Sequence, residues 1–206
     1  GLLTAAGLRV GEYTSPHVDN VRERLSLGGE MISEDDFGDL IESMADYAAA
    51  APSPPSYFEL LTAAALLWFS NEAVEAAVIE VGLLGRFDAT NVVNAKVAVV
   101  TNIGRAHTDG RDGGRRAVAG EKAGIVVKGY PLILGEPAGD VRDLFLSEGG
   151  DPVLVRGEDF GVEGADPAVG GQVANLWSPQ GRYEEVYLPV YGYRQANNAA
   201  VALAAA

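Results

Sequence analysis

The sequence predicts an α/β fold with a mainly parallel sheet flanked by helices, plus a small β-rich appendage. Two short apolar runs rich in β-branched residues, at 76–81 and 97–101, are typical of strands buried in a parallel sheet. Alanine-rich segments and the 26 glycines indicate helices that pack closely on that sheet. Residues 151–190 differ, because short strand-like runs separated by Gly, Pro and Asp predict a β-rich region without helices.

The first half of the chain predicts two capped helices. Residues 1–8 have the pattern of a helix end and 9–13 that of a strand, whereas 14–30 are polar and predict a long loop. A serine with an acid three residues later opens a helix expected over 33–51. A clearer capping box opens another over 56–70, which is apolar nearly all round and therefore expected to be buried.

The second half continues the strand and helix alternation. A glycine-rich turn at 110–114 precedes a predicted helix that contains Glu121 and Lys122. A third strand is expected at 131–134 and a further helix at 140–147. The chain closes on an alanine-rich helix from 195 onward. Because no repeat or low-complexity linker interrupts it, we expect one central domain over 1–206, with 151–190 as its appendage.

Composition narrows the class of protein. A chain of 206 residues with 48% hydrophobic residues can bury a proper core, and zero cysteines exclude disulfides and thiolate metal sites. A net charge of −14 argues against nucleic acid as a partner. No apolar run reaches transmembrane length and no signal peptide is seen, so we expect a cytoplasmic monomer that does not bind membranes.

Charge is distributed unevenly along the chain. Residues 101–128 carry six Arg or Lys against three acids, in a chain that is otherwise acidic. Such a basic segment could hold an anionic substrate or nucleotide phosphates, and it could equally be a solvated loop and helix face.

The ends of the two apolar strands carry the candidate chemistry. Glu80 lies at the end of the first strand, and His107, one of only two histidines, follows the second. Ligands of open α/β sheets bind outside the carboxyl ends of the strands, so both side chains would face one edge if the strands were parallel neighbours. Magnesium keeps its waters and needs few protein ligands, so this pair would suffice; the alternative is a buried hydrogen-bonded pair.

Several separated motifs together carry a family resemblance. Tyr-Thr-Ser-Pro-His at 13–17, Arg-Glu-Arg at 22–24, the segment 76–91, Glu-Lys-Ala-Gly-Ile at 121–125 and the segment 192–200 occur in order. The chain resembles the folylpolyglutamate synthase and dihydrofolate synthase family of the Mur-ligase-like superfamily. The resemblance places the glycine-rich phosphate loop before the first residue and the glutamate-binding domain after the last, so it implies the central part of a larger enzyme that is inactive alone.

The resemblance implies an ATP- and magnesium-dependent carbon-nitrogen ligase. ATP would phosphorylate a carboxylate of dihydropteroate or a folate, and the amine of L-glutamate would attack the acyl phosphate. Ser15, Glu80 and His107 would be metal ligands. Lys122 matches a lysine that is carbamylated in the family and would support catalysis, together with His107, at a second magnesium; its sequence context alone favours a surface lysine.

Two further groups of residues would bind the ligands. Gln195 and Asn198 match positions that contact adenine, and their amides both donate and accept; the alternative is that they cap the last helix. His17, Arg22 and Arg24 lie in the loop that the family uses over its pterin substrate, although an isolated Arg-Glu-Arg is more often a solvated charge run.

The sequence departs from the family pattern at three positions. Leu84 replaces a glycine, which would matter if that turn needs a positive φ. Ala106 replaces an aspartate and Arg194 a histidine. Ala106 leaves open a Mur ligase that acts on a cell-wall precursor, and the departures together leave open a non-catalytic remnant or binding domain.

Overall fold

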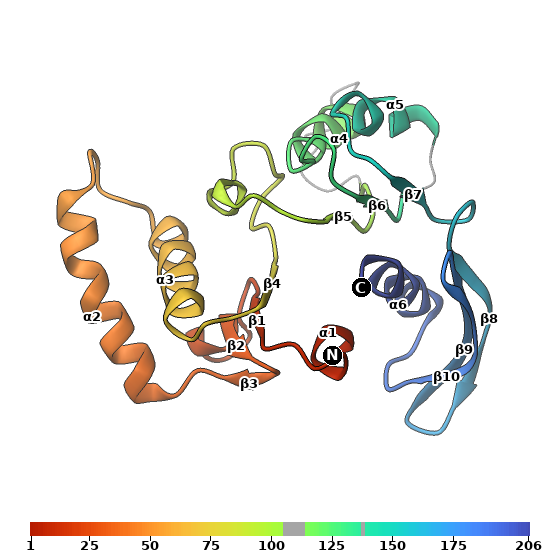
Figure 1. Ribbon diagram of the computed structural model, residues 1–206, viewed down its shortest axis with the longest axis horizontal. Helices are drawn as coiled ribbons and strands as arrows, with labels where there is room; N and C mark the ends of the chain where they lie inside the picture. Colours follow the sequence, from red (N-terminus) through yellow and green to blue (C-terminus); the bar gives the residue numbers. More distant parts are fainter. Residues whose placement is uncertain (105–113, 137–138) are drawn as a thin grey trace. The chain divides into compact units, whose positions relative to one another are not determined.

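The computed structural model describes residues 1–104, 114–136 and 139–206. The chain forms two compact units, Gly1–Val93 and Asn94–Ala206 (Figure 1). The first unit has one sheet and the second has two, and each unit has its own helices.

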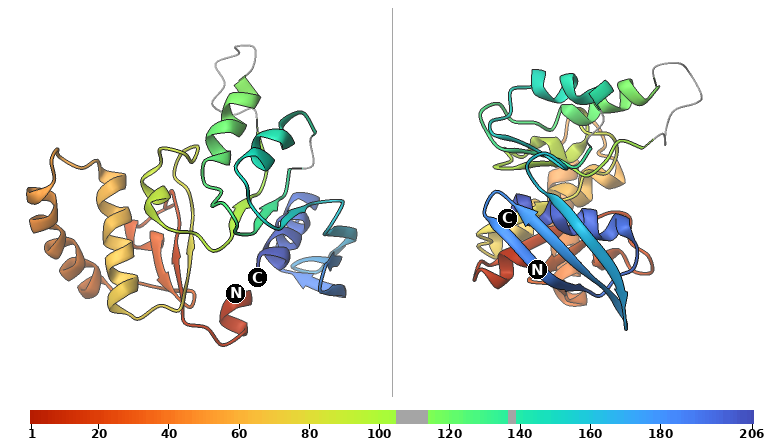
Figure 2. Two further views of the ribbon diagram at one scale, coloured as in Figure 1. Left: turned by 45° about the horizontal axis from the view of Figure 1, so that its top comes forward. Right: turned by 90° about the vertical axis from the view of Figure 1, so that its right-hand side faces the viewer.

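The first unit is a four-stranded mixed sheet covered by two helices. The strand order is β3-β2-β1-β4, with β1 antiparallel to β2 and parallel to β4. Helix α3 lies between the sheet and α2 (Figures 1 and 2). The elements are α1 (Leu2–Ala5), β1 (Val10–Tyr13), η1 (Val21–Arg24), β2 (Leu25–Leu27), β3 (Glu30–Met31), α2 (Glu34–Ala50), α3 (Tyr57–Asn71), β4 (Ala76–Ile79) and η2 (Ala89–Val92).

Helix α3 confirms the capping box predicted from the sequence. The Glu59 backbone N–H donates to Ser56 Oγ at 3.3 Å, and the Ser56 backbone N–H donates to Glu59 Oε2 at 2.7 Å. Two of the orphan N–H groups of a helix start are thereby satisfied. Behind the cap, α3 buries Ala64, Ala65 and Phe69 in the core of the first unit.

Two expectations for the first unit were wrong. The segment 14–30 is not all loop, because it contains η1 and β2, and Leu25 of β2 is fully buried. Pairing of β2 with β1 decides this, and such tertiary pairing overrides a polar local sequence. The strand β4 forms where expected, but it is not buried: it is the last strand of its sheet, and Val78 is 49% exposed.

The second unit holds a parallel sheet and an antiparallel sheet. The parallel order is β5-β6-β7, the antiparallel order is β10-β9-β8, and α6 packs on β8 and β9. The elements are β5 (Ala98–Val100), α4 (Gly114–Ala123), β6 (Leu132–Leu134), α5 (Gly139–Ser147), β7 (Val153–Val155), β8 (Gly161–Ala168), β9 (Gly171–Ser178), β10 (Gly181–Leu188) and α6 (Tyr193–Ala205).

The predicted fold class is confirmed, with a later start for the antiparallel region. Strand β7 lies within the expected β-rich segment, but it pairs in parallel with β6. The antiparallel sheet therefore begins at β8. Ile133, Phe160 and Ala200 share a core in which α6 seals one face of this region. Over the residues described, no helix is long and apolar enough to cross a membrane.

Candidate functional site

The ends of β1 and β4 bring Ser15 and Glu80 together. The two strands are parallel and pair Tyr13 with Ile79, so the chain emerges from both at one edge. The Ser15 backbone N–H donates to Glu80 Oε2 at 2.7 Å, and the Glu80 backbone N–H donates to the Tyr13 carbonyl at 2.8 Å. Residues 65 apart in sequence thus meet where open α/β sheets bind ligands.

The donors at this edge fit a magnesium ion that keeps most of its own waters. Glu80 is exposed, and within the described ranges its carboxylate forms no ion pair. A carboxylate and a hydroxyl are both hard oxygen donors, which magnesium prefers. The described residues contain no cluster of three or more His, Cys, Asp and Glu that could cage a metal.

The glycine-containing turn after Glu80 is held by one aspartate. Asp88 Oδ2 accepts from the Leu83 backbone N–H at 2.8 Å, and Asp88 Oδ1 accepts from the Thr90 backbone N–H at 3.0 Å. Leu84 has φ +62°, so this turn does need a positive φ, and a leucine occupies it at a steric cost. The condition under which this departure from glycine would matter, a positive φ, is therefore met.

Arg22 and Arg24 are not a solvated charge run. Both lie in η1, where Arg22 Nη1 donates to the Ile32 carbonyl at 3.1 Å. Arg24 is only 8% exposed; its Nε donates to His17 Nδ1 at 2.9 Å, and its guanidinium lies 5.7 Å from the centroid of the Tyr57 ring. The described contacts of both arginines therefore organise the loop between Ser15 and β2.

The sequence analysis did not identify two buried polar side chains near this loop, those of Tyr13 and Thr62. Tyr13 is 1% exposed, and burial raises the pKa of its phenol; a hydrogen bond from Thr62 and the nearby Arg24 cation oppose that effect. Thr62 Oγ1 donates to the Phe58 carbonyl at 2.8 Å and lies 3.2 Å from the Tyr13 hydroxyl. A tyrosine at the end of a predicted strand was the only available signal.

The other two residues predicted for the metal sites, His107 and Lys122, belong to the sequence range of the second unit. His107 and Ala106 fall outside the described residues. Strand β4 lies in the sheet of the first unit and β5 in the parallel sheet of the second. Lys122 lies in the last turn of α4 and is half-buried. Its role and the joint metal site stay predictions.

The described arginines of the basic segment are engaged in ion pairs. Arg115 pairs with Glu136 at 3.2 Å and with Asp140, and Arg116 pairs with Asp143. These contacts join α4 to α5, and they lower the pKa values of both aspartates. Arg115 and Arg116 therefore stabilise the packing of α4 against α5.

Gln195 and Asn198 lie together at the start of α6. Both side chains are exposed, and Asn198 Nδ2 donates to Gln195 Oε1 at 3.3 Å. They do not cap the helix: the N-cap is Gly192, with φ +97° and no capping side chain. Their amide edges are thus presented to solvent, as a contact with an aminopurine would require.

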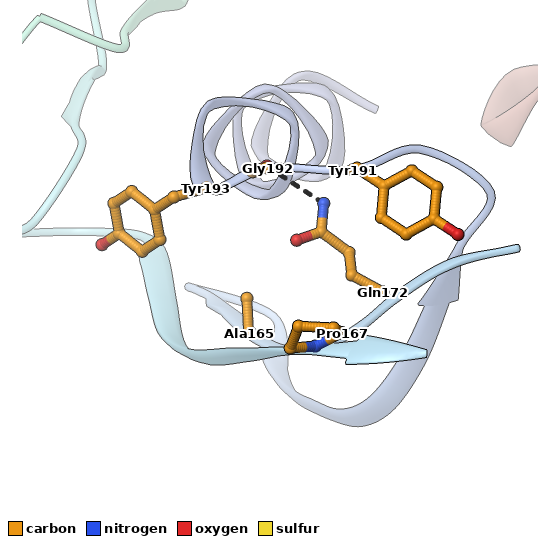
Figure 3. Close-up of a pocket in the computed structure, with 6 residues that line it drawn as sticks. All are labelled: Ala165, Pro167, Gln172, Tyr191, Gly192 and Tyr193. Atoms are coloured by element: carbon orange, nitrogen blue, oxygen red, sulfur yellow. Dashed lines mark hydrogen bonds between the residues drawn. The ribbon is translucent and has the colours of Figure 1, made fainter. Parts of the chain in front are cut away.

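A shallow pocket adjoins this helix start. It has a volume of about 180 Å³ and lies between β8, β9 and the segment that enters α6. Figure 3 shows Tyr191 and Tyr193 on either side of Gln172, whose Nε2 donates to the Gly192 carbonyl at 3.1 Å. The lining residues are Ala165, Pro167, Gln172, Tyr191, Gly192 and Tyr193.

Comparison with known proteins gives concordant sequence and structure matches. No protein-family model matches the chain. The dihydrofolate synthase/folylpolyglutamate synthase of Mycobacterium tuberculosis is 39% identical over 98% of the chain and 46% of its own length. The crystal structures of Mycobacterium tuberculosis folylpolyglutamate synthase complexed with ADP and AMPPCP match with TM-score 0.92 and 38% identity, over 99% of this chain and 49% of that one.

A second solved structure agrees. The Escherichia coli protein FolC in complex with DHPP and ADP matches with TM-score 0.84 and 35% identity, over 99% of this chain and 47% of that one. Because the matches cover nearly the whole chain at high structural similarity, they extend beyond the sheet to the helices and the antiparallel region. By sequence and by fold, the chain therefore belongs to the folylpolyglutamate synthase and dihydrofolate synthase family, and it spans about half the length of the relatives it matches.

Proposed function

We propose that the protein is an ATP- and magnesium-dependent ligase that adds L-glutamate to dihydropteroate or a folate, with its metal site at the ends of β1 and β4. The observation that carries this proposal is the convergence of Ser15 and Glu80, 2.7 Å apart from backbone nitrogen to carboxylate oxygen. Support comes from relatives named as dihydrofolate and folylpolyglutamate synthases, one of them solved with ADP and AMPPCP.

The residues of this edge would position the reacting phosphate. The Ser15 hydroxyl and the second carboxylate oxygen of Glu80 would hold magnesium, with His107 as a further ligand. When bound, magnesium would neutralise charge on the transferring phosphoryl group. The Ser15 N–H fixes the Glu80 carboxylate in advance, so little reorganisation is needed. Lys122, if carbamylated, would add a carboxylate-like group for a second ion.

The remaining residues would bind the organic parts of the substrates. Gln195 and Asn198 would contact the adenine edge, because their amides are exposed and can both donate and accept. His17 and its loop would cover the pterin end of the substrate. The carboxylate of that substrate would be phosphorylated by ATP, and the glutamate amine would displace phosphate from the acyl phosphate to form the amide.

The test is ligation of L-glutamate by the full-length protein with dihydropteroate, tetrahydrofolate or a cell-wall nucleotide precursor as acceptor. We expect magnesium-dependent activity with a folate-type acceptor, and a loss of about 100-fold or more in kcat for Glu80→Ala. Glu12→Gln is the control, because Glu12 lies in β1 of the same sheet and its carboxylate accepts from the Ser26 hydroxyl, not from Ser15.

The possible results separate the alternatives. Activity only with the cell-wall precursor would favour a Mur ligase. No ligation with any acceptor, by a protein that is folded, would favour a binding domain. Equal kcat values in Glu80→Ala and Glu12→Gln would remove Glu80 from the metal site.

A further inference from the structure

The contact of buried Arg24 with half-buried His17 carries an inference about the position of the proton on the imidazole. Arg24 Nε donates to His17 Nδ1 at 2.9 Å. A guanidinium can only donate, since it has no acceptor and stays protonated in proteins. His17 Nδ1 must therefore be the acceptor, and in the neutral ring the proton lies on Nε2.

The surroundings hold Arg24 in the orientation that makes this contact. Arg24 is 8% exposed, and its guanidinium lies over the Tyr57 ring, 5.7 Å from the centroid. It also lies close enough to the Tyr13 phenol to act on that group electrostatically. Aromatic rings on a planar cation restrict its rotation, so Nε stays directed at His17.

The nearest carboxylate on the same helix is already occupied. Glu23 accepts the backbone N–H groups of Val18, Asp19 and Asn20 at 2.8, 3.0 and 2.6 Å. These bonds, with that of Val18 the largest contributor, lower the pKa of Glu23. Glu23 therefore bonds the loop backbone, and it acts on His17 electrostatically, since His17 is the smallest of the effects that lower the pKa of Glu23.

We infer that Arg24 is a positioning residue that fixes His17 as the Nε2–H tautomer, so that His17 presents an uncharged hydrogen-bond donor to a carbonyl or carboxylate oxygen of the substrate. The consequence for the substrate rests on the proposed function; the tautomer does not. A ring with Nδ1 engaged and Nε2 protonated has no free lone pair for a metal. His17 is thus separated in role from Ser15, although only one residue lies between them.

The experiment is a long-range ¹H–¹⁵N correlation spectrum of the imidazole rings in uniformly ¹⁵N-labelled protein, without nucleotide or substrate. The chain has only two histidines, so one His17→Gln sample assigns the signals. At about pH 8, above the ordinary pKa of histidine, Nδ1 should show the shift of an unprotonated nitrogen and Nε2 that of a protonated one. A protonated Nδ1, or averaged shifts at both nitrogens, would overturn the inference.

Two arginine variants test the role of Arg24. Arg24→Met removes every donor at similar side-chain length, and the Nδ1 shift should move toward the averaged value of a ring in tautomeric exchange. Arg22→Met, on the same helix but bonded to the Ile32 carbonyl, should leave the His17 shifts unchanged. An unchanged tautomer in Arg24→Met, or an equal change in both variants, would show that Arg24 does not set it.

The wild-type spectrum decides the tautomer even if Arg24→Met fails to fold. Failure of ligation would leave these shifts untouched, because no ligand takes part in the measurement. The proposed function and the tautomer can therefore fail separately.

Discussion

Two of the parallel strand pairs, β1 with β4 and β5 with β6, are each followed by a glutamate that accepts a backbone N–H, but only one of the two glutamates is paired with a cation. Past β1 and β4, Glu80 accepts the Ser15 backbone N–H at 2.7 Å; past β5 and β6, Glu136 accepts the Ile103 backbone N–H at 3.0 Å. Glu136 is also paired with Arg115, and its side chain is 12% exposed. Glu80 is exposed and forms no ion pair with the described residues.

This difference distinguishes a structural carboxylate from a candidate ligand. The negative charge of Glu136 is compensated within the fold by Arg115, whereas Glu80 has no cation paired with it among the described residues, as the proposed metal site requires. A carboxylate after a parallel strand is therefore not sufficient to mark a metal site. The cation beside it, or the absence of one among the described neighbours, decides the role.

The largest predicted contrast is between the glycines beside the two carboxylates. A Cβ at Gly135 would lie 2.4 Å from the Thr101 carbonyl oxygen, which is backbone and cannot move aside. A Cβ at Gly82 would lie 2.4 Å from the edge of the Phe58 ring, which is half-buried and can rotate. We expect Gly135→Ala to lower the unfolding free energy by about 3 kcal/mol, and Gly82→Ala by about 1 kcal/mol.

Denaturant unfolding of the two variants measures this contrast. Gly38→Ala is the control, because a Cβ there meets nothing within 4 Å on α2, and it should stabilise by about 0.5 to 1 kcal/mol. An equal loss for Gly82→Ala and Gly135→Ala would mean that the two turns are equally rigid.

The second contrast replaces each carboxylate by its amide. In Glu136→Gln, an NH₂ group replaces one oxygen between Ile103 N–H and the Arg115 cation, so we expect a loss of about 2 kcal/mol in unfolding free energy. In Glu80→Gln, the amide oxygen can still accept from Ser15 N–H at an exposed site, and the change should stay within about 0.5 kcal/mol. Thermal and urea unfolding both report it. A larger loss in Glu80→Gln would reverse the assignment of roles.

The third prediction concerns the strained turn after Glu80. Leu84 has φ +62°, so Leu84→Gly should be more stable than Leu84→Ala by about 1 kcal/mol. At an ordinary φ the order is the opposite, because glycine loses more backbone freedom on folding. Comparing the two variants cancels the lost leucine side chain. If alanine proves the more stable, the positive φ does not exist in solution.

The smallest predicted effect is a difference between the two units in how salt changes the pKa values of their carboxyl groups. Arg115 and Arg116 lower the pKa values of Asp140 and Asp143, whereas hydrogen bonds from Ser56 lower that of Glu59. A carboxyl group whose pKa is lowered by folding stabilises the folded state fully at a pH above its ordinary pKa. This stabilisation is lost as the pH falls through the lowered pKa.

Carboxyl ¹³C titrations at low salt and in about 1 M sodium chloride test the salt prediction, since screening there acts within roughly 3 Å. The pKa values of both aspartates should rise toward the ordinary value of 3.8, and that of Glu59 should stay lowered. Equal salt sensitivity would contradict the distinction between ion pairs and neutral donors.

The sequence predicted correctly those structural features that depend on residues close together in the chain. Ser56 and Glu59 predicted the start of α3 because both capping bonds lie within one helical turn. Strand β2 was missed, since Leu25 becomes buried only through pairing with β1. The β4 strand was predicted as buried because its apolar run does not reveal that it ends its sheet.

In the candidate site, too, the sequence predicted the residues, but not the contacts that depend on tertiary structure. The family motifs identified Ser15 and Glu80 as candidate ligands, and the parallel pairing of β1 with β4 brings the two residues together. The bond from Ser15 N–H and the contact of Arg24 with His17 depend on loop geometry that no residue pattern encodes. The ion pairs of Arg115 likewise needed the packing of α4 against α5.

The most direct test of the Glu80 site is the magnesium dependence of ATP-analogue affinity in the full-length protein. Isothermal titration with AMPPCP, with and without magnesium, would compare wild type, Glu80→Gln and Glu136→Gln at a temperature where all are folded. We predict that Glu80→Gln loses about tenfold or more of the affinity gained with magnesium, while Glu136→Gln keeps it. A full magnesium effect in Glu80→Gln, or an equal loss in both variants, would contradict the assignment of Glu80 as the metal ligand.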